Sequence, residues 1–355
     1  MNTLQIKSED WKWQLQNQIR TLPQLEQLFP LSQEEKQAIV ELDNRFRLGI
    51  TPYYLSLMDS TDINCPIRRQ AIPLLAENFI SPQDSEDPLA EERDMPVNSI
   101  TSRYPNRALL YLTHTCAVYC RYCTRRRKVG NSASNNQKDQ ITNAIEWLKN
   151  NPQINDVIIS GGDPLSWSDQ RLDELLSRIR PFITVLRIGT RHPTTLPQRI
   201  TKDLANILAK YPPIYVMTHF NHPKECTPQA QRSLQLLAEA GCVLSNQAVL
   251  LKGINDDAKT LHKLHLWLLQ NRCRPYRLYH CDYSEGVSHF RVSFEKGLRI
   301  LKELRGHSSG LAIPDYVIDL PGGYGKVRVS EGVQKGTDWE FSNWEGHKIT
   351  ITDVQ

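Results

Sequence analysis

The chain has 355 residues, which is long enough for one large domain or two ordinary ones with a substantial hydrophobic core. Hydrophobic residues make up 39% and charged residues 23%, the composition of an ordinary globular protein. The net charge of +4 favours neither nucleic acid nor an anionic membrane surface, and we expect neither as a partner. The chain has no apolar run long enough to span a membrane and does not start like a signal peptide, so we expect a cytoplasmic protein.

Residues 1–100 are predicted to form an N-terminal helical region. The capping box Ser32–Glu35 begins a helix that runs through Leu42, and Trp11–Arg20 is expected to form another helix. Residues 81–100 are acidic and rich in proline, which predicts irregular structure. Regular alternation of strands and helices begins only after this segment.

From Ala108 onward, apolar runs typical of strands alternate with helical patterns such as the one near 141–148. The runs are 108–113, 155–160, 183–188, 214–218, 242–250, 275–280 and 315–320. Six strand–helix units and a final strand predict an α/β fold in which a parallel sheet curls into a partial or full barrel over residues 101–326. Functional side chains are then expected at the C-terminal ends of the strands. Residues 327–355 are predicted to form a short tail that is rich in strands.

Three cysteines follow the first of these strands directly, and Cys116, Cys120 and Cys123 have the spacing C-x3-C-x2-C. Iron–sulfur cubanes usually take four cysteines, so three would leave one iron open to a small molecule. That is the chemical requirement of a radical S-adenosylmethionine (SAM) enzyme, whose open iron binds SAM. A zinc site would need a fourth ligand at matching spacing, and three buried thiols are the remaining alternative. The five other cysteines are scattered, as expected of buried free thiols in a reducing compartment.

The second strand ends in Ser160-Gly161-Gly162-Asp163. Adjacent glycines let the backbone approach a ligand closely, and this edge could bind the amino group of SAM beside the cysteine loop. The alternative is a tight turn between a strand and a helix.

A glycine-rich stretch, Gly322-Gly-Tyr-Gly-Lys326, follows the last strand and is predicted to form a loop. A phosphate-binding P-loop would need Ser or Thr at position 327, which is Val327. A lysine at the active end of a barrel can instead form a Schiff base with pyridoxal phosphate (PLP), if burial lowers its pKa. Without the cysteine motif, Lys326 would be interpreted as a surface lysine.

Two acids and one arginine predict a pocket for a cationic amino acid. Asp282 and Asp319 end the last two strands, where they can bind an ammonium group or cap loops and pair with arginines. Arg125 can grip a carboxylate through two parallel hydrogen bonds. The basic run 125–128, of which Arg125 is the first residue, is either a solvated face or a contact for anionic groups.

Taken together, these motifs resemble the lysine 2,3-aminomutase family of radical SAM enzymes. The similarity extends from Trp11 to Lys326. It rests on Arg103-Tyr-Pro-Asn-Arg107, the cysteine stretch 116–127, Ser160–Asp163, Thr218–His222, Asn246-Gln247, Cys281-Asp282 and Asp319–Lys326.

The resemblance implies a partial (β/α)6-type barrel that holds a [4Fe–4S] cluster, SAM, and PLP bonded to Lys326. The residues that match positions around PLP are Arg103, Tyr104 and Arg107, and those that match positions near SAM are His219 and Gln247. The positions that bind lysine match Arg125 for the α-carboxylate and Asp282 and Asp319 for the ε-ammonium. The implied reaction is the interconversion of L-lysine and β-lysine.

Alternatives and partners follow from the same comparison. The acid pair by itself does not separate lysine from a longer cation such as arginine, so the chain could be an aminomutase for another cationic amino acid. It could also be a dedicated supplier of β-lysine for elongation factor P. From another class, the chain could be an iron–sulfur electron-transfer module with a basic run against RNA. A glutamate-specific relative replaces the two acids with Lys and Asn, which favours a cationic substrate here.

The enzyme is expected to need an external one-electron reductant such as flavodoxin or ferredoxin.

Some family members hold a structural zinc through a cysteine-rich C-terminal extension and one cysteine of the barrel. The sequence up to Gln355 has no such cysteines, and the barrel position is Asp257. We therefore expect no zinc, and a homo-oligomer that need not be the tetramer of those members.

Overall fold

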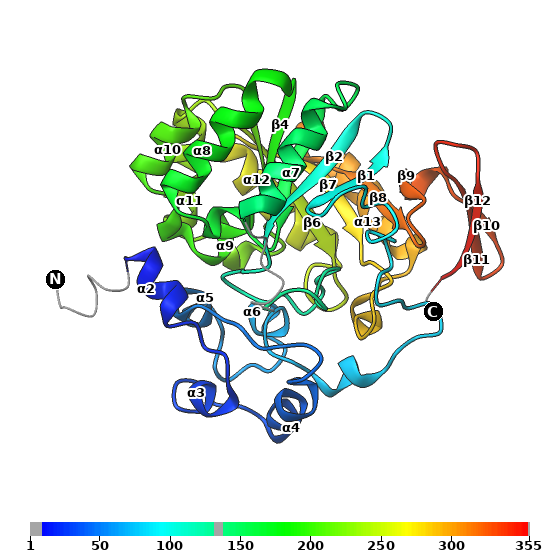
Figure 1. Cartoon of the computed structure of the whole chain (residues 1–355). Coiled ribbons are helices and arrows are strands. Elements are labelled where there is room, and N and C mark those ends of the chain that lie inside the picture. The colour runs from blue at the N-terminus through cyan, green and yellow to red at the C-terminus, as the bar shows by residue number, and fades with distance from the viewer. Residues whose placement is uncertain (1–8, 131–137, 354–355) are drawn as a thin grey trace.

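The computed structural model describes residues 9–130 and 138–353. Nine strands form one continuous sheet in chain order, in which β2 to β8 are parallel and the two edge pairs, β1–β2 and β8–β9, are antiparallel (Figure 1). The strands are β1 (Ile100–Tyr104), β2 (Arg107–Thr113), β3 (Asp156–Gly161), β4 (Val185–Gly189), β5 (Ile214–Thr218), β6 (Val243–Leu250), β7 (Cys273–His280), β8 (Asp315–Leu320) and β9 (Gly325–Arg328).

A helix of at least seven residues lies between each two successive parallel strands and covers the outer face of the curled sheet; between β4 and β5 a short helix, α9 (His192–Thr195), precedes it (Figure 1). Leucine and isoleucine at helical spacing turn one face of each helix to the sheet; in α8, for example, Leu172, Leu175, Leu176 and Ile179 are buried. The six helices are α7 (Lys138–Lys149), α8 (Asp169–Ile179), α10 (Lys202–Leu208), α11 (Pro228–Glu239), α12 (Ala258–Gln270) and α13 (Phe294–His307). The predicted α/β fold, a partial (β/α)6-type barrel with a final strand, is confirmed.

Both edge strands differ from the sequence-based expectation. Residues near 100 and the glycine-rich stretch before Lys326 were predicted to be irregular, because neither carries an apolar run. In the structure β9 pairs with β8 in the register Asp319↔Lys326, so Lys326 lies on a strand rather than in a loop. The helix predicted over Trp11–Arg20 is also shorter, because the backbone of Ile19 leaves it to pair with Ile50.

The N-terminal region lies against the end of the barrel that carries the cysteine loop (Figure 1). It contains α2 (Trp11–Gln16), α3 (Leu22–Glu26), α4 (Gln33–Leu42), α5 (Pro52–Ser56) and α6 (Pro66–Arg69). The predicted capping box of α4 is present, with Ser32 Oγ accepting from the Glu35 amide and Glu35 Oε2 from the Ser32 amide. None of the described helices is long and apolar enough to cross a membrane.

The tail after the barrel is rich in strands, as predicted. A separate antiparallel sheet contains β10 (Val333–Lys335), β11 (Asp338–Ser342) and β12 (Lys348–Thr352). Trp339 and Phe341 of β11 pack against Phe294 of α13 at ring separations of 5.5 and 5.4 Å. Aromatic packing thus fastens the tail to the last helix of the barrel.

Candidate active site

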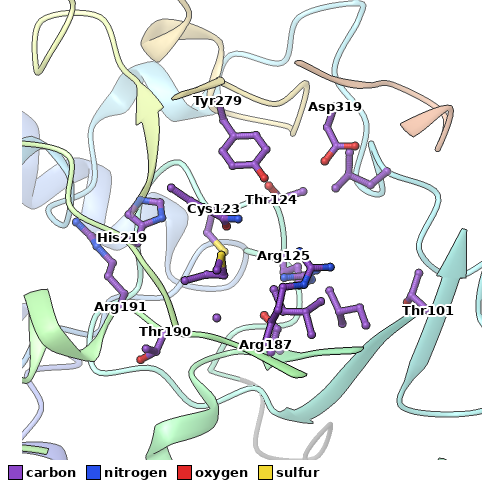
Figure 2. Close-up of a pocket in the computed structure, with 18 of the residues that line it drawn as sticks. Thr101, Cys123, Thr124, Arg125, Arg187, Thr190, Arg191, His219, Tyr279 and Asp319 are labelled. Carbon is purple, nitrogen blue, oxygen red and sulfur yellow. The ribbon is translucent and has the colours of Figure 1, made fainter. Parts of the chain in front are cut away.

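A cavity of about 960 Å³ lies inside the barrel and is lined by side chains from both edge strands, the parallel strands and the cysteine loop. Figure 2 shows Cys123, His219 and Arg191 on one side of it and Asp319 on another, with Tyr279 and Arg125 between them. All residues predicted from the sequence to bind cofactor, metal or substrate line this cavity: Arg103, Tyr104, Arg107, Cys116, Cys120, Cys123, Arg125, Ser160, Gly161, Gly162, Asp163, His219, Gln247, Asp282, Asp319 and Lys326.

The three cysteines of the loop after β2 are free thiols, and their surroundings fit an iron–sulfur cluster. Burial raises the pKa of Cys123 to about 11, and the nearby Cys120 thiolate contributes. Burial, Asp163 and the other two thiolates raise the pKa of Cys116 well above its ordinary value. Thiolates that repel one another in a buried site need compensating positive charge, which iron ions would supply.

The N-terminal region fixes the backbone of the cysteine loop from outside. Gln18 Nε2 donates to the carbonyls of Cys116 and Ala117 at 2.9 and 2.8 Å, and the Tyr119 amide donates to the Gly49 carbonyl at 2.8 Å. These bonds satisfy loop carbonyls and amides that no sheet neighbour can reach. These hydrogen bonds tie the cysteine loop to the N-terminal region.

Arg191 holds the sulfur side of the same loop, and the sequence analysis did not single it out. Its guanidinium lies 2.7 Å from Cys120 Sγ and is balanced by Glu225 Oε1 at 2.8 Å. Arg191 follows β4 by two residues, so the rule that functional groups gather at the C-terminal ends of barrel strands could have found it.

The glycine pair after β3 is required by close packing with the cysteine loop. A Cβ atom at Gly161 would lie 2.5 Å from the carbonyl oxygen of Thr113, and one at Gly162 would lie 2.5 Å from that of Thr115. Gly161 also has a φ of +123°. The turn after β3 is therefore tight, and both glycines also line the cavity.

Asp163 braces the loop after β4. Its carboxylate accepts hydrogen bonds from Thr190 Oγ1 at 2.8 Å and from the amides of Arg191 and His192 at 2.7 and 3.1 Å. It therefore ties the ends of β3 and β4 together beside the cysteines.

His219 lies beyond the end of β5 and faces the cavity next to Arg191 (Figure 2). Burial and the positive charge of Arg191 lower the pKa of His219 well below its ordinary value, so the ring is neutral. Its Nε2 atom lies 3.0 Å from the Tyr122 hydroxyl. Gln247 lines the cavity from β6, the strand that pairs with β5.

Lys326 and Asp319 form an ion pair on the opposite side, with 2.5 Å between Lys326 Nζ and Asp319 Oδ2. Burial would lower the pKa of Lys326, but the charge of Asp319 outweighs burial and raises it above its ordinary value. The condition that burial lower this pKa is therefore not met while Asp319 pairs with Lys326, because the cross-strand carboxylate outweighs burial. Asp319 also accepts from Arg103 Nη1 at 3.4 Å.

The groups around Lys326 fit PLP. The Lys326 amide donates to the Tyr104 hydroxyl at 2.8 Å, and the Arg107 guanidinium lies 4.1 Å from the centre of the Tyr104 ring. Trp344 of the tail lies 6.1 Å from the same ring and also lines the cavity. An amine, two arginines and two aromatic rings offer partners for an aldehyde, a phosphate and a pyridine ring.

Asp282 is a second carboxylate near Asp319. Burial and the charge of Asp319 raise the pKa of Asp282 to about 6, although a hydrogen bond from the Thr124 hydroxyl opposes the shift. A bound cation would relieve the repulsion between the two acids.

Arg125 is held on one edge by Glu91, a residue in the segment predicted to be irregular. Arg125 Nη2 lies 2.6 Å from Glu91 Oε1, and Arg125 Nε donates to the Tyr111 hydroxyl at 2.9 Å. Burial would raise the pKa of Glu91, but Arg125 outweighs it and holds the value at about 2. Nothing in the local sequence indicates that Glu91 reaches this site.

A barrel with three cysteines on the loop after its first parallel strand defines a radical SAM enzyme, and residues 110–264 match the family model described as the radical SAM superfamily. Residues 301–334 match the model described as lysine-2,3-aminomutase. The chain is 47% identical to L-lysine 2,3-aminomutase of Clostridium subterminale over 90% of this chain and 77% of that protein. It is 46% identical to the enzyme of the same name from Methanococcus maripaludis, over 95% of this chain and 80% of that one. Glutamate 2,3-aminomutase of Clostridioides difficile is 41% identical over 99% of this chain and 85% of that protein.

The chain belongs to the lysine 2,3-aminomutase family. Membership of the radical SAM superfamily implies a [4Fe–4S] cluster and SAM. Relatives named for lysine and for glutamate match this chain at similar identity, so overall similarity does not decide the substrate and the residues of the cavity must do so.

Proposed function

We propose that this protein interconverts L-lysine and β-lysine and uses PLP bonded to Lys326. One observation carries the proposal: Asp282 and Asp319 line the same cavity as the three cysteines, Lys326 and Arg125. The cavity thus offers two carboxylates for a distal ammonium and a guanidinium for an α-carboxylate.

Different residues of the cavity would hold each cofactor. All of the following line the cavity: Cys116, Cys120 and Cys123 would hold the cluster, and Ser160, Gly161, Gly162, Asp163, His219 and Gln247 would surround SAM. Lys326 would hold PLP, with Arg103, Tyr104 and Arg107 around it. The cluster and SAM supply radical chemistry at an unactivated carbon, and PLP supplies a temporary partner for the migrating nitrogen.

Asp319 would perform two tasks in sequence. Before PLP is bound, its Oδ2 atom, 2.5 Å from Lys326 Nζ, would pair with the lysine ammonium, and the lysine would release its proton to solvent before bonding PLP. Once Lys326 is engaged, the same carboxylate is free to accept hydrogen bonds from the ammonium group of the substrate. Asp282, whose pKa is raised by burial and by the charge of Asp319, would share the positive charge of that ammonium group.

The acid pair disfavours glutamate as the substrate. A side-chain carboxylate in this position would face two acids in a buried site, and like charges there oppose binding. We therefore do not expect this protein to act on glutamate, although it is 41% identical to the glutamate 2,3-aminomutase of Clostridioides difficile.

Further parts of the proposal concern assembly and surroundings. We place the enzyme in the cytoplasm, with an external one-electron reductant such as flavodoxin or ferredoxin, and as a homo-oligomer. We also propose that it binds no zinc; Asp257, at the position of the barrel cysteine, accepts a hydrogen bond from the Thr260 amide at 2.8 Å and caps α12.

The deciding experiment is an anaerobic assay of the enzyme reconstituted with iron, sulfide, PLP and SAM against lysine, arginine and glutamate. We expect β-lysine as the main product, and no turnover when PLP is left out. Turnover of arginine or glutamate at a higher kcat/KM than lysine would contradict the proposed substrate. An absence of PLP binding would instead favour an iron–sulfur module.

A further inference from the structure

Residues 84–94 belong to the acidic segment that was predicted to be irregular, and we call them the acidic strap. They lie along the active site and form ion pairs with basic side chains from other parts of the chain. The pairs with arginines outside the strap are Asp84–Arg291, Asp87–Arg127, Glu91–Arg125, Glu92–Arg127 and Asp94–Arg103. The strap thus contacts both the arginine proposed to bind substrate and one of those proposed to surround PLP.

Glu91 makes the most enclosed contact of the strap with the cavity. Its side chain is 4% exposed, and it holds Arg125 through Oε1 and Oε2, at 3.0 and 3.1 Å from Nε. The Arg125 guanidinium also lies over the Tyr111 ring, 5.0 Å from its centre. One edge and one face of the guanidinium are therefore fixed.

The remaining edge of Arg125 is available for a ligand. Among the described residues, no hydrogen bond is recorded for Arg125 Nη1, whereas Nε and Nη2 both donate to Glu91. A guanidinium has five donors in a rigid fork, so one edge can bind Glu91 while another binds a second carboxylate. Arg125 lines the cavity, where that second carboxylate would come from the substrate.

We propose that Glu91 is a positioning residue, which orients the guanidinium of Arg125 so that its free edge receives the α-carboxylate of the substrate. The inference rests on the proposed function, because it assumes that Arg125 binds this carboxylate. Arginine has a long flexible side chain, and a misplacement of about 1 Å at a binding group can cost on the order of a hundredfold in rate. Glu91 removes that freedom before the substrate arrives.

The negative charge of Glu91 and its orienting contact should have opposite effects on lysine binding, so a substitution at Glu91 distinguishes them. Glu91 is ionised and neutralises Arg125, so its removal would expose more positive charge to an α-carboxylate. If charge alone mattered, Glu91→Gln would tighten binding of lysine. If orientation matters more, the same substitution would weaken it.

The experiment compares L-lysine with cadaverine, which is lysine without its carboxylate. The Kd of each compound is measured by calorimetry on PLP-loaded Glu91→Gln without SAM, and the KM and kcat for lysine are measured on the complete enzyme. We expect Kd and KM for lysine to rise about tenfold or more, with a smaller change in kcat and an unchanged Kd for cadaverine. Glu92→Gln is the matched control, because Glu92 lies next in the strap, is 65% exposed and pairs with Arg127 instead.

Arg125→Gln separates failure of this inference from failure of the proposed function. If Arg125→Gln weakens lysine but not cadaverine while Glu91→Gln changes neither, Arg125 binds the carboxylate and Glu91 does not position it. If Arg125→Gln also leaves lysine binding unchanged, the substrate assignment itself fails. Equal weakening of lysine and cadaverine by Glu91→Gln would show a general structural role and overturn the inference, as would tighter binding of lysine.

Discussion

Asp319 and Lys326 face each other across the antiparallel pair β8–β9, seven residues apart in the chain and 2.5 Å apart at Oδ2 and Nζ. The pairing explains how a lysine that follows three glycines closely is held in place. The strand register fixes its backbone, and the carboxylate fixes its amine. It also means that the lysine is charged until its proton is removed.

Lys326→Ala should prevent PLP from attaching while leaving the cluster in place, because the two groups are held by different strands. The measurement is the visible absorbance of PLP and of the cluster in the same reconstituted sample. Lys335→Ala, on the exposed tail, is the control and should keep both signals. Borohydride reduction that labels a different lysine would show that Lys326 is not the attachment site.

Asp319→Asn should reduce the preference of the enzyme for lysine over norleucine, which lacks the ε-ammonium group. Hydrogen bonds to charged groups contribute roughly 1.5–3 kcal/mol, so kcat/KM for lysine should fall about 10- to 150-fold. Asp315→Asn, at the other end of β8, pairs with the exposed Arg328 and should leave the preference unchanged. If the ratio of kcat/KM for lysine to kcat/KM for norleucine is unchanged in Asp319→Asn, then Asp319 does not bind the ε-ammonium group of the substrate.

Asp282→Asn should stabilise the cofactor-free protein, and the gain should depend on pH. The pKa of Asp282 is raised from 3.8 to about 6, so the folded state binds its proton more tightly than the unfolded state does. The native protein therefore loses stability as pH rises between these values, by up to about 3 kcal/mol. Asparagine does not titrate and avoids this loss.

Urea denaturation of both proteins at pH 8 and pH 5 checks the expectation. The difference in free energy of unfolding should be larger at pH 8 and should shrink toward pH 5. A difference that is the same at both pH values would mean that the buried charge of Asp282 is not its cause.

Gly162→Ala should disturb the cysteine loop, because the added Cβ would lie 2.5 Å from the Thr115 carbonyl oxygen. Overpacking against backbone costs roughly 1–3 kcal/mol, so both the Tm and the iron retained after reconstitution should fall. Gly306→Ala in α13 is the control, since its Cβ would meet no atom within 4 Å and alanine favours a helix. Full iron retention by Gly162→Ala would show that the loop tolerates the displacement.

The sequence by itself determined the features that local chemistry encodes. The seven apolar runs became the seven parallel strands, because buried strands need continuous apolar residues and the helices between them need helical spacing. The spacing of Cys116, Cys120 and Cys123 lies within a single loop, so it could be interpreted without the fold. Lys326 and the acids Asp282 and Asp319 could be placed near one another because parallel strands end on the same side.

Only the tertiary structure decided which partner each charged side chain has. Glu91 and Arg125 are 34 residues apart, and Arg191 and Cys120 are 71 apart, so no periodicity connects them. The acidic strap has no regular structure, and its course is set by ion pairs with arginines on distant elements. The pKa of Lys326 shows the consequence. Burial by itself would lower this pKa, but the strand register places Asp319 Oδ2 2.5 Å from Lys326 Nζ, and this carboxylate raises the pKa above its ordinary value.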